Sequence, residues 1–92
     1  MSSPPEPVHL NNHHRNTLRE LFRHPTGHNI EWHSVVSLME AVGSVTTHHD
    51  GKVTVTVGSQ SLVLPPPEGK DIDARTVVEL RGMLAAAGYS AG

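Results

Sequence analysis

Apolar residues between positions 30 and 43 repeat with the period of an α-helix. They follow the i, i+3, i+4, i+7, i+10 spacing of one buried stripe, at Trp32, Val35, Val36, Met39 and Val42. Asn29 precedes the stripe as a good N-cap, and Glu31 suits the positive end of the helix dipole. Gly43 is placed to end this helix in a left-handed conformation.

Residues 44–64 change to the period of two that is typical of strands. Two turn signals, Asp50-Gly51 and Gly58-Ser59, divide them into three strands. A two-residue Asp-Gly turn would mix apolar and polar residues on each face. A three-residue loop over 49–51, with Gly51 as a left-handed bulge, separates them. With a two-residue loop at the second turn, the predicted pairs are Val45 with Val55, Thr47 with Val53, Val55 with Leu62 and Val53 with Leu64.

This register gives the sheet one apolar face and one polar face. The apolar face carries Val45, Val53, Val55, Val57, Leu62 and Leu64. The polar face carries Ser44, Thr46, His48, Lys52, Thr54, Thr56, Ser61 and Val63. Because such a sheet is covered by helices on its apolar side only, we expect both long helices there and an open polar face.

The segments on either side of this core have weaker patterns. A final helix over about 74–87 follows the cap Asp73 and ends at Gly88, after which Tyr89 can pack back on the preceding turn. A short extra helix is expected over 14–24, although the capping-box spacing of Thr17 and Glu20 also allows a start at Thr17. Residues 1–13 are rich in Pro, Ser, Asn and His and are expected to form a disordered leader.

The predicted fold class is α+β. A single domain over 14–92, with its core over 29–89, has a three-stranded antiparallel sheet with helices packed on one face. No apolar run reaches the roughly 18 residues that cross a bilayer, and the start of the chain does not resemble a signal peptide. We therefore expect a cytoplasmic protein with no membrane partner.

Composition limits the chemistry. The absence of cysteine excludes disulfides and thiolate zinc sites, and we expect no cofactor. The eight histidines are the side chains most ready to act as a base, a metal ligand or a pH switch. A formal charge of −2, with seven Lys and Arg, counts against a dedicated nucleic-acid binder, because such proteins are usually basic.

The histidines supply two sets of candidate site residues. His48 and His49 lie at the first hairpin tip, where one of them could act as a general base with Lys52 stabilising a phosphate oxyanion. The alternative is that they are solvated neighbours of the Asp-Gly turn. The candidate ligands for Zn²⁺ or Ni²⁺, which flank the junction of the first two helices, are His24, His28 and His33. Their spacing matches no recognised motif, and the alternative is that they cap or pack on helix ends.

A second kind of candidate site is a binding surface. Arginines recur every four residues along the first helix and could form a basic strip or an ordinary solvated face. Together with the open sheet face and one loop lysine, they are the residues expected to contact RNA or a protein partner: Lys52, Thr54, Thr56, Arg15, Arg19, Arg23 and Lys70.

The order of these elements over residues 30–89 resembles the HicA-type toxin family, which has the double-stranded-RNA-binding-domain-like fold. The features that carry the resemblance are a helix ending in Gly43, the turn glycine Gly51, the strand running into Leu64-Pro65, the loop 69–72, and a helix ending in 86–89, Ala-Ala-Gly-Tyr. The resemblance implies a small mRNA-cleaving ribonuclease of a bacterial toxin–antitoxin system, with an antitoxin protein as partner.

The chain departs from the family's pattern at the residues that carry activity. The family's catalytic histidine lies in a Gly-Ser-His element, but this chain reads Gly51-Lys52-Val53 there. Pro66-Pro67 replaces a further histidine after the strand-ending proline, and the family's basic character is missing. We therefore expect a binding module on this fold without ribonuclease activity. An active toxin using His48 or His49 is the first alternative, and a metal- or pH-responsive interaction protein is the second.

Overall fold

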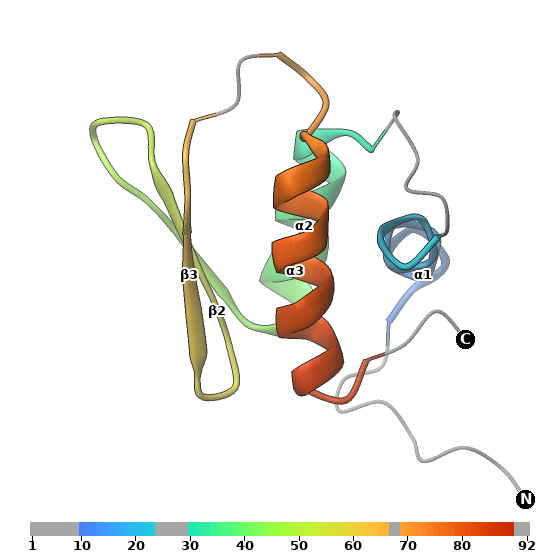
Figure 1. Ribbon diagram of the computed structural model, residues 1–92. Coiled ribbons are helices and arrows are strands. Elements are labelled where there is room, and N and C mark those ends of the chain that lie inside the picture. Colours follow the sequence, from blue (N-terminus) through green and yellow to red (C-terminus); the bar gives the residue numbers. More distant parts are fainter. Residues whose placement is uncertain (1–9, 24–29, 67–68, 90–92) are drawn as a thin grey trace, which may run out of the picture.

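Two helices cover one face of a three-stranded antiparallel sheet, and a third helix packs behind them (Figure 1). The computed structural model describes residues 10–23, 30–66 and 69–89. The element order confirms the predicted α+β fold with α-α-β-β-β-α topology. The elements are α1 (Asn12–Leu21), α2 (Trp32–Val42), β1 (Ser44–Thr47), β2 (Val53–Val57), β3 (Gln60–Leu64) and α3 (Ala74–Ala86).

The register of the sheet is the one predicted from the alternation of apolar residues. All four expected pairs are present, in the strand order β1-β2-β3. The first turn is the three-residue loop, because the His48 N–H donates to the Lys52 carbonyl oxygen at 2.8 Å and Gly51 has a φ of 92°. The polar face stays open because α2 and α3 both lie on the other side (Figure 1).

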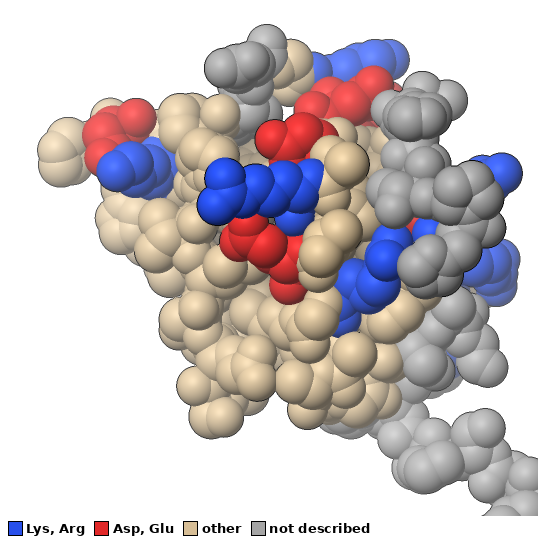
Figure 2. Space-filling view, viewed as in Figure 1, with Lys and Arg blue, Asp and Glu red and all other residues tan. Residues whose placement is uncertain are grey.

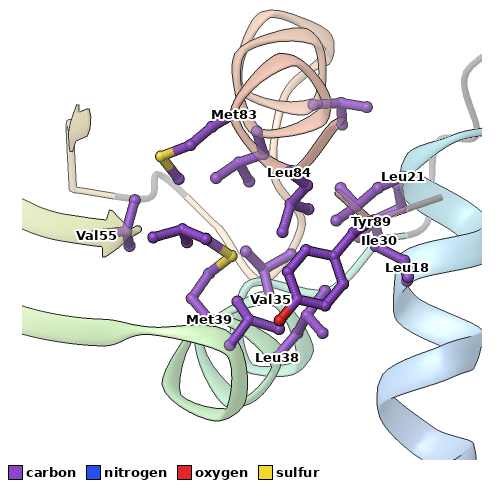
Figure 3. Close-up of a cluster of buried hydrophobic side chains, with 14 of the residues drawn as sticks. Leu18, Leu21, Ile30, Val35, Leu38, Met39, Val55, Met83, Leu84 and Tyr89 are labelled. Atoms are coloured by element: carbon purple, nitrogen blue, oxygen red, sulfur yellow. The ribbon is translucent and has the colours of Figure 1, made fainter. Parts of the chain in front are cut away.

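The core fills two interfaces, one between the sheet and the helix pair and one between that pair and α1. Figure 3 shows Met39 and Met83 on the side of the sheet, near Val55. The ring of Tyr89 lies in the second interface, among side chains from α1 and α2 (Figure 3). Its position follows from a Schellman turn after α3, in which the Tyr89 N–H donates to the Leu84 carbonyl oxygen at 3.0 Å.

The first helix begins earlier than predicted, at Asn12 rather than at residue 14 or at Thr17. Asn11 caps it by accepting the His14 N–H at 2.8 Å. Leu10 is only 2% exposed and belongs to the core. The prediction of a disordered leader is therefore wrong for residues 10–13. The sequence could not reveal this, because a single buried leucine leaves no periodic signal.

The start of α2 is fixed by backbone pairing instead of a side-chain cap. Its N-cap is Glu31, which makes no capping hydrogen bond with its side chain, and the predicted cap Asn29 lies outside the described residues. The Trp32 N–H donates to the Lys70 carbonyl oxygen at 2.6 Å, and the Ile72 N–H donates to the Ile30 carbonyl oxygen at 3.0 Å. These bonds attach the loop before α3 to the beginning of α2.

The buried stripe of α2 is rotated from the predicted one. Val35, Met39 and Val42 are buried as expected, but Val36 is only half-buried and Leu38 is fully buried instead. Figure 3 shows Leu38 on the flank that faces Tyr89 and α1. The rotation therefore follows from the third layer, since α1 covers a flank that a two-layer fold would leave exposed.

Gly43 ends α2, but it does not adopt the predicted left-handed conformation. Its φ is −166°, which is extended backbone. A Cβ at this position would collide with the carbonyl oxygen of Thr56 and would lie 3.2 Å from the Cα of Val57. Glycine is therefore needed here because the backbone at Gly43 lies directly against the backbone of β2. This close approach allows the short connection between α2 and β1.

Candidate binding surface

The open face of the sheet consists of three cross-strand rows of side chains. Because paired residues on neighbouring strands point to the same side of a sheet, the register assigns each row. The rows are Ser44–Thr56–Ser61, Thr46–Thr54–Val63 and, at the hairpin tip, His48–Lys52. The structure thus brings together the predicted sheet residues Lys52, Thr54 and Thr56.

Side chains on this face hydrogen-bond to one another across the strands. The His48 Nε2 and the Thr54 hydroxyl lie 2.8 Å apart, and the Thr56 and Ser61 hydroxyls lie 3.0 Å apart. Val63, in the middle row, has no polar atom to offer and is 58% exposed. The result is a hydroxyl-bearing face whose only permanent charge is Lys52, with one large apolar side chain at the edge strand β3.

The hairpin tip holds the candidate catalytic residues His48 and His49, both exposed. Asp50 accepts the Lys52 N–H at 3.0 Å, so its carboxylate stabilises the turn. In the described part of the chain, the only hydrogen bond of the His48 ring is to Thr54, and no carboxylate orients that ring. A histidine without a placed carboxylate or second base lacks the arrangement that general acid–base catalysis uses.

Val53 occupies the position where the resemblance would place a catalytic histidine. It is 4% exposed and contributes to the core, as its place on the apolar face predicted. A side chain at this position points toward α2 and α3 and away from the open face. The position is therefore structural in this chain.

The predicted arginine strip lies away from the sheet face, because α1 is on the far side of the helix pair (Figure 1). Arg23 follows the helix end and forms an ion pair with Glu20 at 3.6 Å, and Arg19 donates to the Asn16 side chain at 3.2 Å. Arg15, on the same helix, is half-buried. The sheet and arginine candidates therefore belong to two separate surfaces.

Two cations outside α1 lie next to acidic side chains. Lys70 lies 3.8 Å from Glu31, and Arg75 lies 3.3 Å from Glu79. Figure 2 shows basic and acidic side chains interspersed over one face of the molecule instead of gathered by sign. On the face that this view shows, the charges do not form the continuous positive patch that binding to a nucleic-acid backbone requires.

The candidate metal ligands are only partly described. His33 is exposed in the first turn of α2, whereas His24 and His28 lie outside the described residues. Among residues 10–23, 30–66 and 69–89, no three His, Asp or Glu side chains come close enough to hold a metal ion. The metal hypothesis therefore gains no support from the residues that the structure places.

A groove that sequence reasoning missed lies on the helix side of the sheet, between α2 and the end of β1. It has a volume of about 640 Å³ and includes Trp32, Val36 and Glu40 in its lining. The helical spacing alone predicts Trp32 and Val36 in the buried stripe. Glu40 follows Val36 at the same four-residue spacing by which Val36 follows Trp32, so an acidic residue continues the same row of the helix. This is the signal that could have suggested a boundary between core and solvent.

None of the helices in the described residues is long and apolar enough to span a bilayer. Comparison with family models, with curated proteins and with solved structures finds no match for this chain.

Proposed function

We propose that this protein is a small binding module without ribonuclease activity, on a fold similar to that of HicA-type toxins, and that its open sheet face recognises a protein partner. A bacterial cytoplasmic location, which the resemblance implies, is part of this proposal. The observation that carries the proposal is the middle row of the face, where Val63 is 58% exposed beside the hydroxyls of Thr46 and Thr54. An apolar centre within a polar rim is the usual anatomy of protein interfaces.

Charge favours a protein over RNA as the partner. Of the eight side chains on the open face, only Lys52 is a permanent cation. Binding to single-stranded nucleic acid gains from counterion release in proportion to the phosphates neutralised, with a salt slope of about −0.7 for each. One lysine supports about one such contact, whereas tight binders make several.

The proposal is tested with two valines of equal exposure on different surfaces. Val63→Asp places a charge on the open face, and the control Val78→Asp does the same on α3, where Val78 is 57% exposed. Each variant is expressed with an affinity tag in the source organism, and captured proteins are quantified by mass spectrometry. We expect one protein to be retained by the wild type and by Val78→Asp but lost from Val63→Asp. If no captured protein depends on Val63, the proposal is wrong.

An active ribonuclease is the second candidate, and one observation favours it. The ring of His48 is held by Thr54 on the open face, near Lys52, so an imidazole and a cation share an accessible surface. This candidate expects induced expression to arrest growth and degrade mRNA, and the double variant His48→Ala/His49→Ala to abolish both effects. Our first proposal instead expects that neither the wild type nor the double variant cleaves mRNA.

A further inference from the structure

The groove between α2 and β1 has both apolar and polar side chains in its lining. Figure 1 shows the β1–β2 hairpin diverging from the helices toward its tip, and the groove occupies this region. Trp32 and Val36, one turn apart on α2, line one side, while Val53 and Thr47 line the other. Its volume of about 640 Å³ falls within the range of roughly 300–1,000 Å³ that is usual for ligand sites.

The strand beside this groove has unpaired backbone groups. The strand order is β1-β2-β3, so β1 pairs with a neighbour on one side only. The His48 N–H bonds to Lys52, and hydrogen-bonded and non-hydrogen-bonded pairs alternate along an antiparallel ladder. The N–H and C=O groups of Val45 and Thr47 therefore point away from β2, where no other strand pairs with them in the described part of the chain.

A single acidic side chain gives the groove its charge. Glu40 lines it, one turn after Val36 on α2. Within residues 10–23, 30–66 and 69–89, the carboxylate of Glu40 forms no ion pair, unlike those of Glu20, Glu31 and Glu79. His33 is the only basic side chain in the groove lining. A basic group on the occupant would complement this charge.

We infer that the groove binds an extended peptide segment of a partner protein, which adds a strand to the edge of β1. Its backbone bonds to Val45 and Thr47, its alternate apolar side chains enter the space beside Trp32 and Val36, and a lysine or arginine pairs with Glu40. Edge-strand addition of this kind combines main-chain bonds for affinity with pockets for specificity. The inference goes beyond the proposed function because the groove lies on the helix side of the sheet and does not include the open face.

The same charge argument disfavours a second copy of the chain as the occupant. Two copies paired through β1 would each offer the sequence Ser-Val-Thr-Thr to the other. This segment contains no cation, so the paired strand itself would offer no partner to the carboxylate of Glu40. A peptide with a basic residue can hydrogen-bond to the outward-pointing backbone groups of β1 and also pair with the carboxylate of Glu40.

The probe for this inference is a phage-displayed library of random peptides of about ten residues, long enough to span an edge strand. Selected peptides are synthesised, and their Kd values are measured by fluorescence anisotropy against the wild type and three variants. Val36→Lys places a charge in the groove, Val78→Lys is the matched control on α3, and Val63→Asp alters only the open face. We expect Val36→Lys to raise Kd by at least about tenfold, with the other two variants unchanged.

Two further measurements keep the result interpretable if Val36→Lys folds poorly. In the wild-type complex, amide hydrogen exchange at Val45 and Thr47 is expected to slow by about tenfold or more. Glu40→Lys is expected to weaken binding, and a peptide with glutamate in place of its basic residue is expected to restore it.

Three outcomes would overturn the inference: no enriched peptide, equal binding to Val36→Lys and wild type, or unchanged exchange at Val45 and Thr47. Concentration-dependent dimerisation that protects these two amides without peptide would assign the edge to a second copy instead. Because Val63→Asp leaves the groove intact, loss of the partner at the open face and loss of the peptide are separate results.

Discussion

Gly43 offers a sharp test of how α2 is joined to the sheet. The structure attributes the need for glycine to the close approach of Thr56 and not to a left-handed backbone, because φ is −166°. A methyl group would lie 2.9 Å from the Thr56 carbonyl carbon and even closer to its oxygen. Since both of these are backbone atoms, β2 must move away from the helix end to make room.

The expected cost of Gly43→Ala follows from this collision. Overpacking a tight contact costs about 1–3 kcal/mol, and the lower entropy of the unfolded alanine chain offsets about 0.4–1 kcal/mol of it. We therefore expect a net loss of about 1–2 kcal/mol, since the cost of the collision exceeds the entropic gain. At roughly 4–8 °C per kcal/mol for a domain of this size, the Tm falls by about 5–15 °C.

The assay is thermal and urea unfolding of three variants. Gly43→Asn distinguishes the two explanations, because asparagine tolerates a left-handed backbone but still carries a Cβ. The control Gly82→Ala, exposed in α3 with open space around its Cβ, is expected to stabilise by up to about 1 kcal/mol. If Gly43→Asn proves clearly more stable than Gly43→Ala, the close-approach explanation fails and the left-handed cap is correct.

Three further predictions concern the ends of the helices and the histidines. Hydrogen bonds from the side chain and then the backbone of Thr76 hold the pKa of Asp73 below its ordinary value. This contribution to stability is present above the unfolded pKa of about 3.9 and is lost as pH falls through the lower folded value. Asp73→Asn, which keeps the capping oxygen, should therefore lose less stability below about pH 4 in acid unfolding curves; identical curves would contradict this. Leu10→Ala should destabilise by about 2 kcal/mol, near the lower end for a buried leucine because Leu10 precedes α1 and its segment can relax more than a helix can. An unchanged urea midpoint would place Leu10 outside the core. Added Zn²⁺ should leave the Tm unchanged, since His33 is exposed and belongs to no group of three His, Asp or Glu side chains in the described residues. A rise in Tm would support the junction histidines as ligands.

The sheet could be predicted from sequence because its determinants are local. Alternation along 44–64 and the glycines at the two turns leave only one register that separates the faces, and this register is the one observed. The final helix was equally predictable, since Asp73 and Gly88 lie at its two ends and Tyr89 packs back after it. In these elements, neighbouring residues carry the information.

What could not be predicted depends on contacts between distant segments. The packing of α1 on the helix pair buries Leu10 and Leu38, and no periodicity within either segment reveals this. The same packing separates the arginines of α1 from the sheet face, so the predicted binding residues divide into two surfaces. The reason for glycine at position 43 was also not predicted, because it is the contact with the backbone of Thr56, which is 13 residues away on β2.

The most direct test of the proposed function is a map of the partner's contacts on the protein. The captured partner is added to isotope-labelled protein, and amide chemical-shift changes are followed by NMR. Our proposal predicts that the largest chemical-shift changes fall on the open face, at Thr46, Thr54 and Val63. Changes at the edge of β1 would report on the separate peptide groove and are not counted in this test. Changes confined to the arginines of α1, or changes that leave Thr46, Thr54 and Val63 unaffected, would contradict it.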